Sequence, residues 1–451
     1  MSDWLIQRFL NYGDRNCLAT SAANHSYGEL FQRVEALYET FQQAGIQSGQ
    51  VVTLNGDYTV DGIAALFALF KLHTIVAPMT ALATEEVQLR KAESGARWHI
   101  DTSTTNATTI QPISSDTQSI HPLIQSLVDA QEAGLILFSS GSTGRPKAMV
   151  HNADHLLSAF EKKRARRHRI LIFLLFDHIG GINTLFNGLA SGATLVVPEN
   201  RSPEAVASVI AQHKANLLPA SPTFLNLLLM SGMHERYDLS SLRYITYGTE
   251  PMPASLLSRL KQSFPETALI QTFGTSETGI TQTTSRSSDS TQIKIDDPNT
   301  EYKIVEGELW LRSKSQILGY LNHNMDRFTE DGWFKTGDLV EASDDGYLTI
   351  QGRREDLINV GGEKVTPSEV ESVLMQIPEV ADCLVYAESN AITGQHVAAE
   401  IVPIDTADTK QLKRAIKQHC RAQLSPYKVP ARIVFADSTR FSSRFKKMRR
   451  P

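Results

Sequence analysis

Cysteine is scarce in this sequence, and its arrangement suggests neither cross-links nor a metal site. Cys17, Cys383 and Cys420 are the only cysteines among 451 residues, and no two of them have CxxC spacing. Disulfide frameworks and structural zinc sites use closely spaced cysteines or cysteine–histidine sets. The sequence therefore indicates neither kind of site, and a reducing cytoplasm is the expected compartment.

An excess of charge of one sign is also missing. The chain has 44 Lys and Arg against 49 Asp and Glu, a formal net charge of −5. Because a balanced surface creates no strong long-range field, we expect neither nucleic acid nor an anionic membrane as a partner. The N-terminal MSDWLIQRFLNYGDRN has no basic stretch before a long apolar run, and no segment approaches the roughly 18 apolar residues of a membrane span. We expect the protein to be neither exported nor inserted.

Internal repeats are not visible at the periods of solenoids or propellers, so function must depend on localised motifs. What is present is a globular composition, with 41% hydrophobic and 21% charged residues. A length of 451 residues exceeds what one hydrophobic core normally covers. The length therefore predicts two or more domains.

Short apolar runs alternate with helical patterns between residues 135 and 280. LILF, ATLVV, YITYG and ALIQTF are typical of buried strands. A helix is predicted among them, because Ser202 can cap it, Pro203 suits its first turn, and apolar residues between 206 and 210 fall on one face. This alternation predicts an α/β fold of layered sheets and helices.

The sequence outside this region changes character twice. From Ser94 to Ser119 it is rich in Thr, Ser and Asn, and we expect a surface connection there. After Gly307, GELWLRS and DGYLTIQGR predict strands, and a helix is expected to begin near Pro367. A smaller α+β unit is predicted to start near Gly352.

The segment FSSGSTGRPKAMVH, Phe138–His151, has the composition of a phosphate-binding loop. An apolar strand runs directly into small residues that can offer backbone N–H and hydroxyl donors to an anion, and Lys147 adds a positive charge. The candidate donors are Ser139, Ser140, Gly141, Ser142, Thr143 and Gly144. The loop is not a Walker P-loop, because Pro146 precedes the lysine and Ala148 follows it. An ordinary Ser/Gly surface turn is the structural alternative.

This segment resembles the phosphate loop of the adenylate-forming superfamily, which includes acyl- and aryl-CoA ligases, amino acid adenylation domains and firefly luciferase. QTFGTSETG, Gln271–Gly279, is similar to that family's Tyr-Gly-x-Thr-Glu signature. The resemblance implies that Phe273 stacks on adenine, Ser276 contacts the phosphate or the carboxylate, and Glu277 holds Mg²⁺. A capped turn is the structural alternative. The other ATP-binding candidates in this segment are Gly274 and Thr275.

Two other segments resemble nucleotide contacts of the family. YGTEP, Tyr247–Pro251, is similar to the loop that sandwiches adenine, which implies ATP contacts from Gly248, Thr249 and Glu250. In WFKTGDL, Asp338 is similar to the ribose-binding aspartate, whose carboxylate can accept both ribose hydroxyls. Taken alone, each segment could be an ordinary turn.

GRREDLINVGGEKVTPSEVE, Gly352–Glu371, resembles the hinge and the first C-terminal strand of the family. The resemblance implies a ribose contact for Arg353 and a hinge at Asp356. It also implies close approach of the CoA pantetheine arm at Gly361 and Gly362. A hinge has a physical purpose here, because two half-reactions need different faces of a mobile lid.

LFDHIGGIN, Leu175–Asn183, resembles a region where many acyl- and aryl-CoA ligases place a histidine three residues before a glycine. His178 and Gly181 fit that spacing, and His178 is implied as a gate or pocket residue for the acid. A lone histidine is more often structural. Phe176 and Asp177 leave another alternative open, since amino acid adenylation domains use a Phe-Asp pair here to bind the substrate ammonium.

The chain departs from the family at its end, DSTRFSSRFKKMRRP. Counting from Asp437 places Lys446 at the position of the lysine that approaches the reacting carboxylate and the α-phosphate. Phe445 replaces the glycine before that lysine, which restricts the backbone, so Lys447 is an alternative. A solvated basic tail is the structural alternative. The basic pair that follows is Arg449 and Arg450.

Together the resemblance implies an α/β protein with a large N-terminal domain of layered sheets and helices, residues 1–352, that binds ATP and the acid. A smaller α+β C-terminal lid would cover residues 353–451. The implied reaction forms an acyl-AMP from an aromatic or medium-length acid, releases pyrophosphate, and passes the acyl group to coenzyme A. Lys446, Glu277 and His178 are the catalytic candidates, with ATP, Mg²⁺ and CoA as cofactors.

Three alternatives to this reaction stay open. The chain could load an acyl or amino acid onto an acyl carrier protein, whose pantetheine offers the same thiol. It could be a homologue that binds ATP or acyl ligands without turnover, because its terminal segment is altered. Luciferase-like oxidation of an adenylate would use the same ATP motifs.

Overall fold

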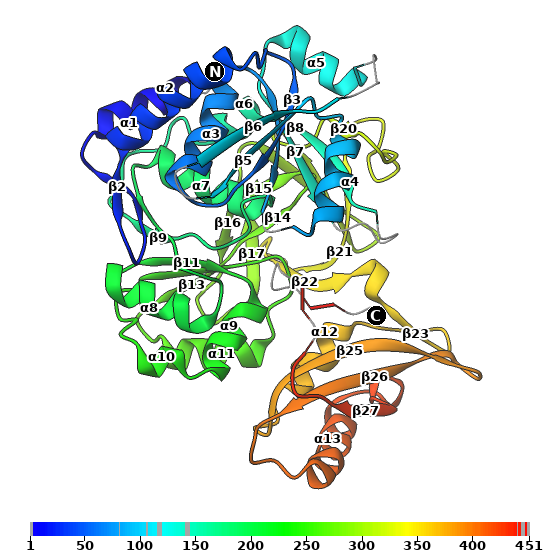
Figure 1. The fold of residues 1–451 in the computed structure, drawn as a ribbon. Helices are drawn as coiled ribbons and strands as arrows, with labels where there is room; N and C mark the ends of the chain where they lie inside the picture. The colour runs from blue at the N-terminus through cyan, green and yellow to red at the C-terminus, as the bar shows by residue number, and fades with distance from the viewer. Residues whose placement is uncertain are drawn as a thin grey trace. The chain divides into compact units, whose positions relative to one another are not determined.

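The computed structural model describes residues 3–80, 82–104, 107–114, 120–139, 145–439, 441–442 and 447–448. The chain divides into two compact units. Figure 1 labels the helices and strands and colours them in chain order. The first unit is Met1–Pro219, Gly274–Ile280 and Arg312–Phe334; the second is Ala220–Phe273, Thr281–Leu311 and Lys335–Pro451. Within the described residues, no helix is long and apolar enough to cross a membrane.

One sheet of the first unit carries the predicted phosphate loop. Its strand order is β20-β8-β7-β4-β3-β5-β6. Strands β3, β4, β5 and β7 pair in parallel, whereas β7 and β8 form an antiparallel hairpin. Strand β7 lies inside the sheet, and the predicted loop leads from its end to Lys147, the first residue of β8. The bounds are β3 (Val51–Asn55), β4 (Ile75–Met79), β5 (Trp98–Thr104), β6 (Ala107–Pro112), β7 (Gly134–Ser139), β8 (Lys147–Asn152) and β20 (Gly319–Tyr320).

The expected surface connection between Ser94 and Ser119 is wrong for its central part. β5 and β6 form an antiparallel pair there and extend the sheet to its edge. Ile100 and Thr102 are buried, and the Trp98 indole donates a hydrogen bond to Gln50 (2.8 Å). Threonine is β-branched and suits strands, so a Thr-rich composition fits an edge strand better than a loop.

A second group of strands in the first unit follows the order β11-β9-β10-β1-β2. The predicted helix after Ser202 is confirmed as α8, whose first turn is capped by the Ser202 hydroxyl (3.2 Å from the Ala205 N–H). The strands are β1 (Asn16–Ala19), β2 (Asn24–Ser26), β9 (Arg169–Leu171), β10 (Thr194–Val196) and β11 (Leu217–Ala220). The helices are α1 (Asp3–Tyr12), α2 (Tyr27–Gln43), α3 (Val60–Lys71), α4 (Thr84–Ser94), α5 (Pro122–Ala130), α6 (Ala153–Ser158), α7 (Ile179–Ala190) and α8 (Pro203–His213).

One hydrophobic cluster among the described residues joins many of these elements. It contains residues of both groups of strands and of α1, α2, α3 and α7. Phe9, Tyr27, Phe67 and Phe186 form its aromatic centre, with ring centroids of neighbouring pairs 5.4 to 6.0 Å apart. Strands and helices thus share one core, and the predicted class of layered α/β structure is confirmed.

The second unit begins with two parallel strands and their helices. Strand β12 (Tyr244–Tyr247) pairs with β13 (Ala268–Gln271), as the apolar runs predicted. A sheet of order β16-β17-β22-β21-β19-β18 follows, and it contains the predicted strands GELWLRS and DGYLTIQGR. Its bounds are β16 (Thr283–Ser285), β17 (Gln292–Ile295), β18 (Thr300–Val305), β19 (Glu308–Ser313), β21 (Phe334–Ala342) and β22 (Leu348–Arg353). The helices are α9 (Pro222–Met230), α10 (Met233–Arg236) and α11 (Ala254–Ser263).

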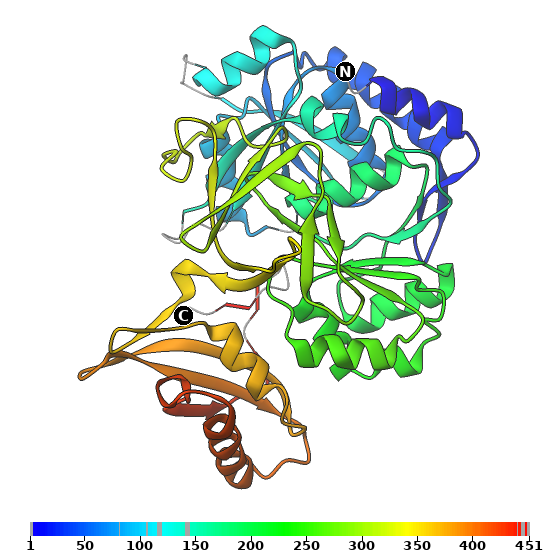
Figure 2. The same cartoon turned by 180° about the vertical axis from the view of Figure 1, so that it is seen from behind.

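A five-stranded sheet lies in the C-terminal part, coloured orange to red in Figure 2. Helix α12 begins at Pro367, as predicted, and packs with α13 on one hydrophobic cluster of this sheet. The predicted boundary between residues 352 and 353 stays a prediction. The elements are β23 (Ile358–Val360), β24 (Glu363–Val365), α12 (Pro367–Leu374), β25 (Val380–Asn390), β26 (Gly394–Pro403), α13 (Thr409–Gln423) and β27 (Arg432–Phe435).

Candidate functional site

The two ends of the predicted phosphate loop are held together by the β7–β8 hairpin. Ser139, the last residue of β7, pairs in register with Lys147, the first residue of β8. Residues 140–144, which include the predicted donors Ser140, Gly141, Ser142, Thr143 and Gly144, lie outside the described residues. Sheet pairing on both sides therefore fixes where this loop leaves and re-enters the sheet.

Asn322 ties the second half of this segment to a neighbouring strand connection. Its Oδ1 accepts the Ala148 N–H (2.9 Å), and its Nδ2 donates to the Pro146 carbonyl (2.9 Å) and to Glu93 (2.8 Å). Glu93 also pairs with Arg145 (2.7 Å). One amide side chain thus saturates backbone groups on both sides of Lys147, a structural support that the sequence analysis did not identify.

Lys147, Tyr320 and Glu277 form a continuous chain of contacts in the first unit. The Lys147 ammonium lies 5.8 Å from the centre of the Tyr320 ring. The Tyr320 hydroxyl donates to Glu277 Oε1 (3.1 Å). Burial and the nearby Glu277 carboxylate raise the pKa of Tyr320 well above its ordinary value, so the hydroxyl remains a donor. A cation, an aromatic ring and a carboxylate are therefore arranged beside the phosphate-loop hairpin.

Glu277 has the chemistry that Mg²⁺ requires. This ion prefers hard oxygen ligands and usually takes one or two carboxylates, with the rest from substrate phosphates and water. Among the described residues, no group of three or more His, Cys, Asp or Glu side chains is arranged to hold a metal. The single half-buried carboxylate of Glu277 fits an ion that arrives with a nucleotide.

The segment around Glu277 is a tight hairpin of β14 (Phe273–Thr275) and β15 (Gly279–Thr281). The Thr275 hydroxyl accepts the Thr278 N–H (3.1 Å), so the turn is capped. A Cβ at Gly274 would lie 2.4 Å from the Gly279 carbonyl, which explains the glycine sterically. Ser276, at the tip, is half-buried. Its predicted contact with phosphate or carboxylate stays a prediction.

The predicted adenine loop adjoins the segment that leads to Phe273. Tyr247 and Gln271 are paired residues at the carboxyl ends of β12 and β13, and the Thr272 N–H donates to the Tyr247 carbonyl (2.7 Å). A Cβ at Gly248 would lie 2.7 Å from the Thr272 carbonyl oxygen. The carboxyl ends of parallel strands are where ligands bind in open α/β sheets. The structure thus brings Gly248 and the Phe273 segment together.

Thr249 has an unusual backbone conformation, whereas the Phe273 side chain is packed in a hydrophobic cluster. Thr249 has φ 73°, a left-handed conformation that is rare for a β-branched residue and is found at functional sites. Phe273 is only 7% exposed and packs with Ile293, Leu309 and Val340 in the six-stranded sheet. Stacking of Phe273 on adenine stays a prediction.

Glu250, predicted to contact ATP, uses its carboxylate within the protein. Oε1 accepts the Thr223 N–H (2.7 Å), and Oε2 accepts the Lys447 N–H (3.4 Å). Burial raises the pKa of Glu250, whereas the Thr223 hydrogen bond and the Lys447 charge oppose that rise. Its side chain therefore links three segments of the second unit.

The two predicted ribose contacts form an ion pair. Asp338 and Arg353 face each other in register on β21 and β22, with Arg353 Nε 2.7 Å from Asp338 Oδ1. Arg353 also donates to the Thr336 carbonyl (3.0 Å). Asp338 is 6% exposed, so its carboxylate is held rigidly. The sequence placed these residues 15 positions apart; the sheet makes them neighbours.

His178 caps helix α7. Its Nδ1 accepts the Gly180 N–H (3.3 Å), which is the structural role that a lone histidine often has. A Cβ at Gly181 would lie 2.1 Å from the Leu175 carbonyl and 2.4 Å from the Tyr58 hydroxyl. Packing at the start of the helix therefore accounts for the His-x-x-Gly spacing. A pocket role for His178 and Gly181 stays a prediction.

Asp177, the candidate ligand of an amino acid substrate, already has a cationic partner. Arg90 Nη1 donates to Asp177 Oδ2 (2.7 Å), and both side chains are at most 5% exposed. Arg90 also pairs with Glu86 (2.6 Å) and lies over the Phe138 ring. The carboxylate is therefore neutralised from inside the protein.

The predicted hinge and CoA-contact residues lie in short turns. Asp356 ends the 3₁₀ turn η1 (Arg354–Asp356), which connects β22 to β23. Gly361 and Gly362 form the turn between β23 and β24, with φ 62° and 101°. Such angles favour glycine, so the tight turn itself explains the pair. Lys446, Arg449 and Arg450 lie outside the described residues, whereas Lys447 is described and its side chain is 12% exposed.

Comparison with known proteins agrees with these motifs. Residues 7–321 match the AMP-binding enzyme family and residues 369–443 match the AMP-binding enzyme C-terminal domain. A 4-coumarate–CoA ligase-like 9 of Arabidopsis thaliana is 26% identical (93% of this chain, 83% of that protein), and a 2-succinylbenzoate–CoA ligase of Bacillus licheniformis is 28% identical (96% of each). The solved structure of the anthranilate CoA ligase AuaEII with anthranoyl-AMP has the same fold, with TM-score 0.82, 21% identity, and coverage of 99% of this chain and 95% of that chain. The chain belongs to the AMP-binding enzyme family, in the acyl- and aryl-CoA ligase branch of the adenylate-forming superfamily, and its class is that of an AMP-forming acid–thiol ligase.

Proposed function

We propose that the protein joins an aromatic or medium-length carboxylic acid to coenzyme A through an acyl-AMP. The observation that carries this proposal is the contact chain Lys147–Tyr320–Glu277 at the base of the phosphate-loop hairpin. This contact chain supplies a cation for a polyphosphate and a hard carboxylate for Mg²⁺, linked through the Tyr320 side chain.

In the first half-reaction, an oxygen of the substrate carboxylate forms a bond to the α-phosphorus of ATP. The bond from that phosphorus to the bridging oxygen breaks, and pyrophosphate leaves. Lys147 and the loop donors Ser139 to Gly144 offset the charge that develops on the phosphate oxygens, and Lys446 would act at the carboxylate and the α-phosphate. Mg²⁺ at Glu277 would supply further positive charge for the phosphates.

In the second half-reaction, the thiol sulfur of coenzyme A bonds to the acyl carbon. The bond from that carbon to the phosphate oxygen breaks, AMP leaves, and the thiol proton passes to solvent. The protein supplies no thiol of its own among its three cysteines. All three are buried, and burial raises the pKa of Cys17 to about 12 and of Cys420 to about 11. An external thiol is therefore needed.

An aromatic acid is the preferred substrate class. Two relatives are a 4-coumarate–CoA ligase-like protein and a 2-succinylbenzoate–CoA ligase, and the acid in each of these names is aromatic. The Arg90–Asp177 ion pair argues against an α-amino acid, because an incoming ammonium would have to displace a buried guanidinium from Asp177. His178 and Gly181 are the proposed pocket residues.

The acceptor is proposed to be coenzyme A, with an acyl carrier protein as the alternative, in a reducing cytoplasm. The test uses ATP, Mg²⁺ and CoA with benzoates, cinnamates, medium-chain acids and amino acids, and mass spectrometry detects acyl-AMP and acyl-CoA. Acyl-CoA from an aromatic or medium-chain acid supports the proposal. Acyl-AMP without acyl-CoA favours a carrier protein. No pyrophosphate with any acid favours a binding homologue, and oxygen uptake favours oxidation of the adenylate.

A further inference from the structure

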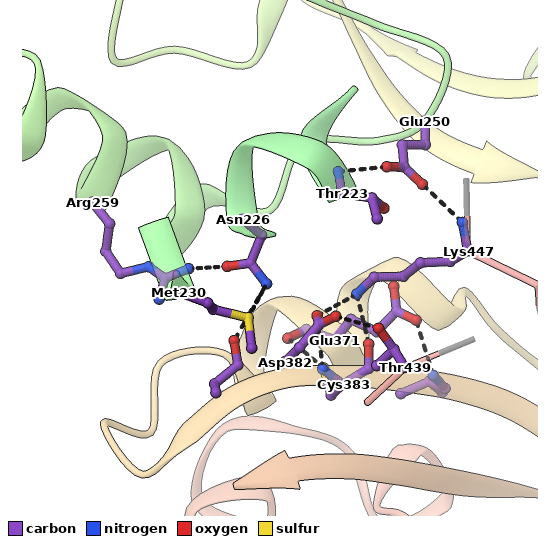
Figure 3. A network of polar contacts seen from close by, with 12 residues as sticks. Thr223, Asn226, Met230, Glu250, Arg259, Glu371, Asp382, Cys383, Thr439 and Lys447 are labelled. Carbon is purple, nitrogen blue, oxygen red and sulfur yellow. Dashed lines mark hydrogen bonds and ion pairs between the residues drawn. The ribbon is translucent and has the colours of Figure 1, made fainter. Parts of the chain in front are cut away.

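The last part of the described chain carries a buried cation, the side chain of Lys447. It is 12% exposed, and its Nζ donates to Asp382 Oδ1 (2.8 Å) and to the Cys383 carbonyl (2.6 Å) (Figure 3). An ammonium removed from water is costly unless a carboxylate and hydrogen-bond acceptors replace the lost hydration. Lys447 has both, so its burial is a built feature of the C-terminal sheet.

The anionic side of this contact is equally well enclosed. Asp382, on β25, is 3% exposed, and Glu371, on α12, is 4% exposed. The Thr439 hydroxyl donates to Asp382 Oδ2 (2.6 Å), and the Val385 N–H donates to Glu371 Oε1 (2.9 Å) (Figure 3). Asp382 contacts the ammonium directly, and the Glu371 carboxylate adds a second negative charge that attracts it.

The charge of Lys447 is protected by these neighbours. Burial by itself lowers the pKa of the lysine, but the attraction of Asp382 and Glu371 outweighs burial and raises the pKa above its ordinary value. An ammonium has three donors, and Asp382 and the Cys383 carbonyl occupy two of them. A side chain bound in this way is suited to hold a segment in place rather than to follow a reacting group.

The main chain of the same residue makes a second link. The Lys447 N–H donates to Glu250 (3.4 Å), and Glu250 also accepts the Thr223 N–H (2.7 Å) at the start of α9. Asn226, one turn further along α9, donates to the Ala381 carbonyl (3.3 Å), next to Asp382 (Figure 3). The YGTEP loop and β25 are thus connected through α9 and through Lys447.

We propose that Lys447 is a positioning residue for the adenylation half-reaction: its side chain anchors residues 447–448 to β25, and its N–H ties them to Glu250 of the adenine loop. This inference rests on the proposed function. The thioester half-reaction needs a different face of the lid. The Lys447 link is therefore required for forming acyl-AMP and dispensable for consuming it. Lys447 and its predicted catalytic neighbour Lys446 then have separate roles.

The test measures the two half-reactions in the full chain. Lys447→Met, which keeps most of the length of the side chain without its charge, should slow acyl-AMP formation about a hundredfold, the loss expected for a misplacement near 1 Å. Thioester formation from supplied acyl-AMP should change little, and Lys447→Arg should recover most of the lost rate. Lys413→Met, an exposed lysine on α13, is the control and should leave both rates unchanged. Equal slowing of both half-reactions, or no recovery with arginine, overturns the inference.

A double-mutant cycle keeps the inference separate from the proposed function. Thermal unfolding is compared for the original chain, Lys447→Met, Asp382→Asn and the double variant. The sum of the stability losses in the two single variants should exceed the stability loss in the double variant, because each single change leaves a buried partner without its counterpart. Additive losses overturn the anchor even if the enzyme is active. If no acid yields acyl-AMP, the proposed function fails, while this cycle still decides whether the anchor exists. If Lys447→Met does not fold, Asp382→Asn is used for the half-reactions, with the same selective loss expected.

Discussion

Two buried ion pairs, Arg90–Asp177 in the first unit and Lys447–Asp382 in the second, have similar chemistry and different surroundings. In the first pair, the Asp177 Oδ1 atom is buried without a hydrogen-bond partner, and the arginine is shared with Glu86. In the second pair, both oxygens of Asp382 accept hydrogen bonds. The first pair neutralises an acid beside a predicted pocket, whereas the second connects segments. Burial alone therefore does not define what an ion pair does.

The largest expected effect on stability comes from breaking the first pair. Arg90→Met should lower the free energy of unfolding by about 3–5 kcal/mol, because the Asp177 carboxylate remains buried without a cation. Urea unfolding of the full chain measures this loss. Glu86→Gln alters the same guanidinium from a side chain that is 42% exposed, and it should cost at most about 1 kcal/mol. Equal losses for the two variants would contradict the role given to Asp177.

Lys446 and Lys447 sharpen the comparison for the second pair. Lys446→Ala should raise the barrier to acyl-AMP formation by about 3–4 kcal/mol, or roughly a hundredfold to a thousandfold in rate, without changing the unfolding temperature. Lys447→Met should change both quantities. Rapid-quench analysis and thermal unfolding provide the measurements. A larger rate loss at Lys447 with unchanged thioester formation and no loss at Lys446 would move the catalytic lysine by one position.

The Glu277 carboxylate accepts a hydrogen bond from a neutral donor, the Tyr320 hydroxyl. Removing this donor should have a smaller effect than removing the cation from either ion pair. Tyr320→Phe removes the hydrogen bond to Glu277 and keeps the ring beside Lys147. We expect kcat/KM for ATP to fall roughly tenfold to a hundredfold, which corresponds to about 1.5–3 kcal/mol of lost transition-state stabilisation. Tyr302→Phe, at an exposed position on β18, is the matched control. Unchanged ATP kinetics in Tyr320→Phe would remove Tyr320 from the site.

The smallest effect on stability is expected at a helix cap. His178→Ala should cost about 1 kcal/mol of unfolding free energy through the lost cap of α7. Ser202→Ala removes the corresponding cap of α8 and should cost a similar amount. Only His178→Ala should also alter turnover with carboxylic acids. Identical kinetics in the two variants would leave His178 with its structural role alone.

Local patterns predicted the fold well where one segment determines its own structure. The apolar runs at β7, β10, β12 and β13 and the capped helix α8 are examples, because periodicity and caps act within a few residues. The Thr-rich strands β5 and β6 were missed, since β5 is placed by its pairing with the distant strand β3, and β6 pairs only with β5. Composition does not contain that information.

The site shows the same limit. Motifs identified Lys147 and Glu277, but Tyr320, which contacts both, lies 43 residues beyond Glu277 on a two-residue strand. The Phe-Asp pair could be interpreted in two ways from sequence. Arg90, 87 residues before Asp177, supplies the counter-charge and favours one of them. The motifs identify site residues, but the contact partners of these residues lie far away in the sequence and become visible only in the structure.

Asn322 has a consequence for the durability of the enzyme. Its amide donates to Pro146 and Glu93 while its oxygen accepts from Ala148, so both ends of the amide are needed. Asparagine is among the thermolabile residues, and loss of its amide nitrogen produces aspartate without any mutation. The new carboxylate would lose both donated hydrogen bonds and would repel Glu93. Ageing at one side chain would then loosen the support of the phosphate loop while the hydrophobic core stayed intact.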